Sequence, residues 1–200
     1  MGSNLGELLI QEKLLDSEQL KSALDFHKKN DVGIGSAIIS LGYLSEEELK
    51  YSPGIPAEAR RQNGPVASIE CLEDIPCNPC ETSCNFDAII VGEDITNIPH
   101  LDGDKCVACQ TCVYICPGQA IFMIDESLPE GKASVMMPYE YRPLPEKGDV
   151  VTALDRAGQE LGDAKVIAVR QTKKMDQTAT VTIEVPKDWS MRARAIRLNR

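Results

Sequence analysis

Apolar residues recur at helical spacing in the N-terminal quarter of the chain, and the pattern occurs twice. A shift of 29 residues superposes Leu5-Gly6-Glu-Leu-Leu-Ile10 on Ile34-Gly35-Ser-Ala-Ile-Ile39. Each copy leads to a helix-capping signal, Asp16-Ser-Glu-Gln19 in the first and Ser45-Glu-Glu-Glu48 in the second. The repeat predicts a small helical domain over residues 1–52. Its helices are expected near residues 4–12, 17–29, 34–41 and 46–51.

The C-terminal part alternates apolar and polar residues, which is the period of a half-buried strand. Alternating, β-branched segments cover residues 149–154, 164–171 and 178–185. They predict a small antiparallel β domain over residues 149–200, SH3-like or barrel-like. Before it, four prolines in residues 127–148 predict an extended connector that lies against a partner or against the chain itself. Residues 53–64 hold two prolines and two glycines and are interpreted as a linker without regular structure.

The middle segment, residues 65–126, contains all eight cysteines of the chain. The run Cys106-x2-Cys109-x2-Cys112-x3-Cys116-Pro117 places three thiolates on one tight loop and leaves the fourth for another site, which suits a 4Fe-4S cube. A second run, Cys71-x5-Cys77-x2-Cys80-x3-Cys84, superposes on it after a shift of 32 residues. We therefore expect an internal duplication that binds two 4Fe-4S clusters, with a strand over residues 66–70 and matching strands at residues 89–91 and 121–124.

Zinc sites and disulfides are the alternatives to iron-sulfur clusters. A zinc ribbon uses two separated Cys-x2-Cys pairs around one ion, and a triplet followed by Cys-Pro fits this arrangement poorly. No positively charged, apolar signal is visible at the N-terminus, so the chain is expected to be cytoplasmic, where thiols stay reduced. Iron-sulfur ligation is therefore the favoured interpretation.

These motifs resemble those of the bacterial dicluster ferredoxin family over residues 65–126. The resemblance implies that the fourth cysteine of each run serves the cluster of the other run. One cluster is then held by Cys71, Cys77, Cys80 and Cys116, and the other by Cys106, Cys109, Cys112 and Cys84. The chain departs from the family at Asn85, where the family has proline, and at Asp74, where the shift places the first ligand. We favour Cys71 as this ligand because cluster iron prefers thiolate, and Asp74 remains an alternative oxygen ligand.

The expected fold class is α+β, with a small helical repeat domain, a ferredoxin-like dicluster domain and a small antiparallel β domain. A formal net charge of -10 argues against a nucleic-acid partner, because phosphate binding needs a basic surface. No apolar run approaches the roughly 20 residues that a membrane span needs. Four arginines near the C-terminus are interpreted as a solvated strand edge, with a docking strip for an acidic partner as the alternative. They are Arg192, Arg194, Arg197 and Arg200.

The Leu-Gly-x-x-Leu pattern of the N-terminal repeat resembles the small helical domain at the N-terminus of type II secretion and pilus-assembly ATPases. Some members of that family bind cyclic di-GMP through an arginine that precedes Leu-Gly. Here Asn4 and Gly33 stand at those positions. A docking module that packs on a partner subunit is therefore preferred over a nucleotide site.

No Rossmann glycine motif, Walker loop or catalytic triad is present, so no catalytic residue is assigned and the chain is expected to transfer electrons only. The run from Cys71 to Cys84 resembles ferredoxin-type subunits that accompany flavin-dependent amino-acid or amine dehydrogenases. The resemblance implies an electron-transfer subunit of a hetero-oligomer, with FAD or FMN on a partner dehydrogenase. A redox-sensing regulatory or scaffold module, with a nucleotide- or partner-binding N-terminal domain, is the alternative.

Overall fold

The N-terminal helices appear in a computed structural model that describes residues 6, 9–10, 14–30, 34–44, 53–71 and 75–199. Helix α2 (Ser17–Asn30) and helix α3 (Ile34–Ser40) confirm two of the four helices expected there. The helix expected at residues 46–51 and most of the helix expected at 4–12 lie outside the described residues, as do Asn4, Gly33 and Asp74.

Side chains at the start of α2 fix where this helix begins. Asp16 Oδ1 accepts hydrogen bonds from the amides of Glu18 (2.9 Å) and Gln19 (2.8 Å), and Gln19 Oε1 accepts one from the Asp16 amide (2.9 Å). This reciprocal arrangement is the capping box that the sequence predicts. Helix α2 buries Ala23 in a small apolar core that also includes Ile98 of the cysteine region, so an apolar contact joins the helical module to that region.

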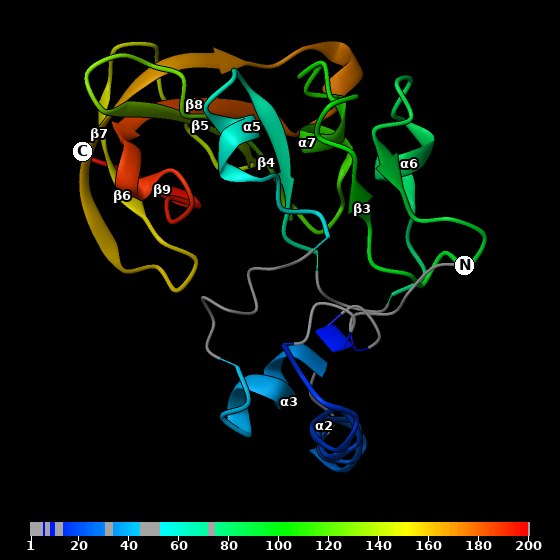
Figure 1. The fold of residues 1–200 in the computed structure, drawn as a ribbon. Helices are drawn as coiled ribbons and strands as arrows, with labels where there is room; N and C mark the ends of the chain where they lie inside the picture. The colour runs from blue at the N-terminus through cyan, green and yellow to red at the C-terminus, as the bar shows by residue number, and fades with distance from the viewer. Residues whose placement is uncertain are drawn as a thin grey trace.

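The main sheet of the remaining chain has seven antiparallel strands in the order β1-β4-β5-β8-β7-β6-β9 (Figure 1). Its strands are β1 (Val66–Ile69), β4 (Ile121–Asp125), β5 (Lys132–Tyr139), β6 (Val150–Leu154), β7 (Glu160–Arg170), β8 (Ala179–Pro186) and β9 (Ala195–Leu198). A two-stranded sheet pairs β2 (Ile89–Ile90) with β3 (His100–Leu101). Short helical segments connect the strands: α5 (Glu58–Arg61), α6 (Pro79–Thr82), α7 (Thr111–Ile115), η1 (Lys173–Met175) and η2 (Lys187–Trp189).

Strand β5 joins the cysteine region to the C-terminal strands. It lies inside the stretch expected to be an extended connector, and it pairs with β4 on one side and with β8 along its whole length on the other. Its residues alternate between partly buried and buried, as the pleat of a half-buried strand requires. Of the two surfaces left open for this stretch, residues 132–139 therefore lie against the chain itself. Strands from both sides of residues 126 and 149 belong to this one sheet. The domain boundaries expected at these residues stay predictions.

Strand β4 is buried on both faces and separates two apolar cores. Phe122 and Ile124 face the core of the C-terminal strands, whereas Ile121 and Met123 face the core that contains the cysteines. Because successive side chains in a strand point to opposite faces, a strand between two cores must be apolar at every position. This explains the unbroken run Ile121-Phe-Met-Ile124.

The duplication predicted from the cysteine spacing is confirmed by the backbone. Helices α6 and α7 begin 32 residues apart, at Pro79 and Thr111. Strand β1 of the first half pairs with β4 of the second, and β3 of the second half pairs with β2 of the first. The Ile69–Ile121 pair of one ladder corresponds to the Leu101–Ile89 pair of the other after the same shift. The two halves are therefore interlocked rather than arranged side by side.

Two equivalent hydrogen bonds extend these ladders toward the cysteine loops. The Glu70 amide donates to the Ala120 carbonyl at 2.8 Å, and the Asp102 amide donates to the Ala88 carbonyl at 2.8 Å. Glu70 and Asp102 differ by the same 32 residues, as do Ala88 and Ala120. Each half thus begins its cysteine loop from a backbone position that the other half holds in place.

The stretch expected to lack regular structure contains helix α5, so that prediction was wrong. Arg61 on this helix binds Glu126 Oε1 through Nε at 2.6 Å, and the Glu126 amide donates to the Arg61 carbonyl at 2.9 Å. Ser190 Oγ, at the end of η2, donates to the same carboxylate at 2.7 Å. These contacts fasten residues 53–64 across the junction of the cysteine region and the C-terminal strands. A helix of four residues has no apolar period from which a sequence could predict it.

The interpretation of the C-terminal arginines as a solvated strand edge was wrong for Arg194. Arg197 is exposed and pairs with exposed Glu160 at 2.8 Å, as a solvated edge would have it. Arg194 instead is buried and binds Glu70 at 2.6 Å. Glu70 follows β1 and Arg194 precedes β9, and these are the two edge strands of the sheet. In the part of the chain described, β1 and β9 do not pair through their backbones, but this ion pair connects their ends.

Replacing Glu126 with glutamine should lower the free energy of unfolding by about 3 kcal/mol, because the Arg61 guanidinium is left largely buried without its counter-ion. A guanidinium chloride titration under anaerobic conditions, followed by the fluorescence of the single tryptophan Trp189, measures this change. The matched control is Arg197→Gln, which removes an exposed ion pair and should change the same free energy by less than about 1 kcal/mol. Equal effects of the two variants would contradict a stabilising role for the buried pair.

Candidate metal centre

The two halves place their cysteines in the same way around their short helices. Cys77 precedes α6, Cys80 lies within it and Cys84 follows it. The equivalent residues around α7 are Cys109, Cys112 and Cys116. The remaining two, Cys71 and Cys106, lie at the start of each loop. No disulfide joins any of the eight cysteines, all of which are among the described residues.

The eight sulfur atoms fall into two groups of four. Following the ligand sets expected from the sequence, the first sulfur group is Cys71, Cys77, Cys80 and Cys116, and the second sulfur group is Cys84, Cys106, Cys109 and Cys112. Each group combines three cysteines of one run with the last cysteine of the other.

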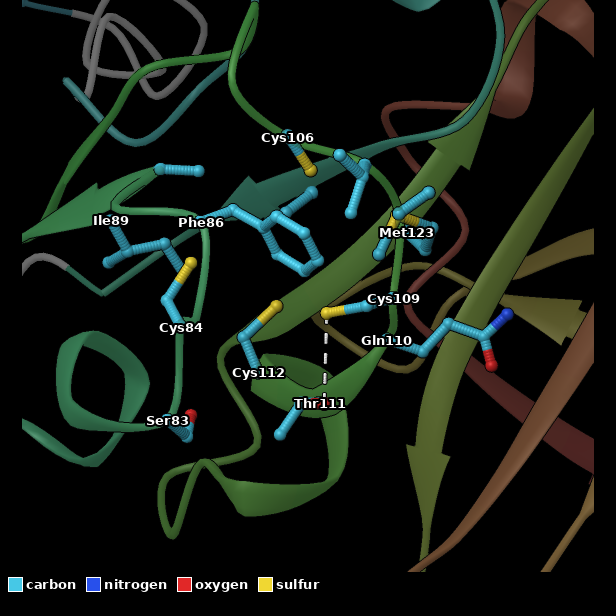
Figure 2. A pocket seen from close by; sticks show the side chains of 14 residues that line it. Ser83, Cys84, Phe86, Ile89, Cys106, Cys109, Gln110, Thr111, Cys112 and Met123 are labelled. Atoms are coloured by element: carbon cyan, nitrogen blue, oxygen red, sulfur yellow. Dashed lines mark hydrogen bonds between the residues drawn. The ribbon is translucent and has the colours of Figure 1, made fainter.

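The second sulfur group lines a pocket of about 340 Å³, a volume that includes the space open to solvent at its mouth. Figure 2 shows the four sulfur atoms pointing toward a common space from separate stretches of chain. Apolar side chains, among them Phe86, Ile89 and Met123, complete the wall. Cys84 reaches this pocket from the first run, which is the crossed arrangement that the resemblance implies.

The loop that carries most of the second sulfur group has an unusual backbone. Ala108 and Gln110 both adopt positive φ values, 56° and 72°, although neither is glycine. Residues of alternating hand aim successive amides toward one side, and such concavities bind phosphates and iron-sulfur clusters. The third residue after the last cysteine of each run also has positive φ, 51° at Asp87 and 50° at Gln119, so the turn is duplicated as well.

The pKa of the Cys80 thiol is shifted by burial and by neighbouring cysteines. The pKa of the Cys80 thiol is raised to about 11, mainly by burial and in part by the charges of Cys116, Cys71 and Cys77, while a backbone hydrogen bond at Glu81 opposes the shift. These three cysteines are the other members of the first sulfur group. Cys116 comes from the second run, so the electrostatic neighbours are crossed here too.

Cys112 is the equivalent buried thiol of the other half. Burial raises its pKa, and the charges of Cys106, Cys109 and Cys84 add to this effect, followed by a smaller contribution from Cys80. The three largest sulfur contributions come from the rest of the second sulfur group. The contribution of Cys80 indicates that the two sulfur groups are neighbours.

The donor set fits iron-sulfur clusters better than single metal ions. A cysteine binds a metal as the deprotonated thiolate. Burial disfavours this charged form unless a positive charge, such as that of iron, lies nearby. Among the residues that the structure describes, no three His, Cys, Asp or Glu side chains converge closely enough to hold one ion. Four sulfurs around one zinc ion would lie about 3.8 Å apart, given Zn–S bonds of about 2.3 Å. Thiols that surround a shared space at larger separations suit a cube placed between them.

Cations reach the cysteine loops from outside the cysteine region. Residues 65–126 contain eleven Asp and Glu but one Lys and no Arg. Arg60 Nη2 donates to the Cys106 carbonyl at 3.0 Å and its Nε donates to the Gly103 carbonyl at 2.8 Å. From strand β7, Arg170 Nη1 donates to Gln110 Oε1 at 3.2 Å. Sequence reasoning missed these contacts, because nothing in the spacing of distant arginines signals a contact with a cysteine loop.

The structure leaves the choice between Cys71 and Asp74 as a prediction, since Asp74 lies outside the described residues. Cys71 contributes to the raised pKa of Cys80, which supports its place in the first sulfur group. Within the second loop, Cys109 is exposed and its sulfur lies 3.7 Å from Thr111 Oγ1 (Figure 2). The second sulfur group is therefore accessible to solvent.

Comparisons with known proteins agree with this chemistry over part of the chain. Residues 99–122, which include the four cysteines of the second run, match a family model described as "4Fe-4S binding domain". One component of the Na(+)-translocating ferredoxin:NAD(+) oxidoreductase complex of Acetobacterium woodii is 40% identical over 48 residues, which are 24% of this chain and 14% of that protein. The type IV pilus assembly ATPase PilB of Myxococcus xanthus is 39% identical over 61 residues, 28% of this chain and 11% of that protein.

The chain thus covers only a small part of the length of each of these relatives, and no solved structure matches it. Among the helices that the structure describes, none is both long enough and apolar enough to cross a bilayer. The matched family model covers the loop of the second run, and the similarity to a component of an oxidoreductase complex points the same way. The chain therefore contains an iron-sulfur ferredoxin domain that binds 4Fe-4S and has an electron-transfer role.

Proposed function

We propose that the chain is an electron-transfer subunit that relays single electrons through two 4Fe-4S clusters within a multi-subunit flavoprotein oxidoreductase complex. The observation that carries this proposal is the pocket in which Cys84 of the first run meets Cys106, Cys109 and Cys112 of the second. The first sulfur group would hold one cluster and the second sulfur group the other. FAD or FMN would be bound by a partner dehydrogenase and not by this chain.

The role of the chain's own residues follows from the site. When bound, the clusters take up and release one electron at a time, and four thiolates leave no iron position open for a substrate. The buried positions of Cys80 and Cys112 fix the inner corners of the two sites. Apolar residues such as Ile89 and Met123 keep water from the wall of the second sulfur group. Exposed Cys109 leaves one side of that group near the surface, where a partner can approach.

Membership of a complex is supported by the parts of the chain that a small electron carrier would not need. The helical module and the strands beyond β4 add surfaces to the ferredoxin domain. One relative is, by its name, part of an oxidoreductase complex. The N-terminal repeat would serve as a docking module that packs on a partner subunit. We place the complex in the cytoplasm and expect it to be a hetero-oligomer.

Anaerobic purification from the native host, with iron, sulfide and flavin counted and the accompanying chains identified, tests the proposal. We expect about eight iron and about eight sulfide ions per chain, as two 4Fe-4S clusters require, together with a flavin-containing partner. Zinc-bound cysteines without iron would overturn the cluster assignment. Clusters without any flavoprotein, together with cluster-dependent binding of a nucleotide or regulator, would favour the redox-sensing alternative.

The crossed ligand sets predict which variants lose the same cluster. Cys84→Ala and Cys106→Ala, one from each run, should abolish the same electron paramagnetic resonance signal of the reduced protein. Cys77→Ala and Cys116→Ala should abolish the other signal, because their sulfurs belong to the first sulfur group. If instead Cys84→Ala and Cys77→Ala remove the same signal, the clusters are held within each run and the crossed assignment is wrong.

The relay role predicts a specific loss of activity in the assembled complex. Cys112→Ala should remove one cluster and reduce electron delivery to the physiological acceptor, because the path through the second sulfur group is interrupted. Reduction of a dye directly at the partner's flavin should stay largely intact. Both rates are measured on complexes whose subunit composition has been checked, and an equal loss of both would contradict the proposed wiring.

A further inference from the structure

Two arginines from the segments that flank the cysteine region in the chain contact residues at the start of its two cysteine loops. Arg60 precedes this region on helix α5, and Arg194 follows it, next to strand β9. The cysteine region itself, residues 65–126, is strongly acidic and has Lys105 as its single Lys or Arg. An electron that enters either cluster adds negative charge to acidic surroundings, so the placement of these two cations bears directly on the clusters.

Arg60 is held entirely by backbone carbonyl groups at the second sulfur group. Its guanidinium donates to the carbonyls of Gly103 (2.8 Å), Cys106 (3.0 Å), Gly64 (3.1 Å) and Pro65 (3.2 Å). Cys106 belongs to the second sulfur group, so the guanidinium touches the backbone of a cysteine that would bind iron. None of the ion pairs found among the described residues includes Arg60, so its contacts at this loop are hydrogen bonds to backbone carbonyls.

Arg194 is held at the first sulfur group by a different set of contacts. It binds Glu70, the residue directly before Cys71, and the two side chains are only 4% and 16% exposed. Its Nη1 also donates to the Ser190 carbonyl at 2.9 Å and to the Ala193 carbonyl at 2.7 Å. A charge fixed in this way and removed from solvent is weakly screened.

Glu70 connects this arginine to two cysteines of the first sulfur group. Cys71 is its neighbour in the chain, and the Glu70 amide donates to the Ala120 carbonyl. The Ala120 amide in turn lies 3.5 Å from Cys116 Sγ as its hydrogen-bond donor. A second arginine, Arg156, also binds Glu70, so the two guanidinium groups leave a net positive charge beside one carboxylate.

The position equivalent to Glu70 in the other half has a different ion pair. Asp102 corresponds to Glu70 after the shift of 32 residues, and its partner is Lys105, 3.2 Å away. Both of these side chains are partly exposed, and the pair is neutral. The arginine contacts are therefore additions to the duplicated structure, made by the segments that flank it.

We infer that Arg60 and Arg194 are positioning residues that raise the reduction potentials of the two clusters separately, Arg60 at the second sulfur group and Arg194 at the first. A fixed positive charge stabilises the reduced cluster, which is the more negative state, and so favours reduction. Arg170 is a further cation near the second sulfur group, but it is exposed and contacts only the Gln110 side chain, so its charge is better screened. This inference rests on the proposed function, since it requires both clusters.

The test is a redox titration of the full chain with both clusters loaded, followed by electron paramagnetic resonance, which gives two midpoint potentials. Arg60→Gln should shift one midpoint to more negative values, and Arg194→Gln should shift the other. Arg60→Lys and Arg194→Lys keep the positive charge, so each of these variants should have a midpoint potential close to that of the unmodified protein. A purely structural role of the hydrogen-bonding fork would make the lysine variants as defective as the glutamine variants.

Glu70→Gln should shift the midpoint potential of the cluster at the first sulfur group in the opposite direction to Arg194→Gln. Removing the carboxylate leaves the arginine charges uncompensated, so this variant should raise the same midpoint that Arg194→Gln lowers. It also tests that half of the inference if the Arg194 variants fail to fold. Arg197→Gln, which removes an exposed cation paired with Glu160, is the matched control and should shift neither midpoint.

The outcomes separate this inference from the proposed function. A chain that binds no pair of clusters overturns the proposed function and the inference with it. Two clusters whose midpoints do not respond to Arg60→Gln and Glu70→Gln overturn the inference alone. The same is true if Arg60→Gln and Glu70→Gln act on one and the same midpoint, or if Glu70→Gln shifts its midpoint downward.

Discussion

The pairing of strands between the two halves of the cysteine region determines the site. Strand β1 pairs with β4 and strand β2 with β3, so each half is completed by a strand of the other. The same exchange brings the last cysteine of each run beside the first three of the other. A thiolate set drawn from two distant loops requires loops whose relative position is fixed. The interlocked ladders supply this constraint, and the two equivalent hydrogen bonds of Glu70 and Asp102 extend it to the edge of each loop.

The sequence predicts those parts of the molecule in which spacing itself carries the information. The cysteine runs predict the duplication, because the shift of 32 residues maps one half onto the other. The crossed sulfur groups follow from the resemblance to dicluster ferredoxins. Helices α2 and α3 and the strands β6, β7 and β8 follow from apolar periodicity. The capping box at Asp16 is equally local, since both of its partners lie within three residues.

What the sequence does not predict depends on contacts between distant residues. Helix α5 has no apolar period, and its stability comes from Arg61 and Glu126, which are far apart in the chain. Arg194 belongs to a C-terminal segment that has the pattern of a polar edge, and only the fold reveals its burial against Glu70. The contacts of Arg60 with the second cysteine loop have the same character. Spacing therefore predicts which cysteines are candidate cluster ligands, but not which charges surround them.

The two-sided burial of β4 has a consequence for the independence of the ferredoxin domain. Phe122 and Ile124 are covered by residues that follow β4, including Val135 of β5 and Ile183 of β8. A ferredoxin domain truncated after residue 126 would expose these apolar side chains to water, and exposed hydrophobic surface favours self-association. The ferredoxin domain therefore depends on the C-terminal strands to cover one face of β4 and is not an independent folding unit.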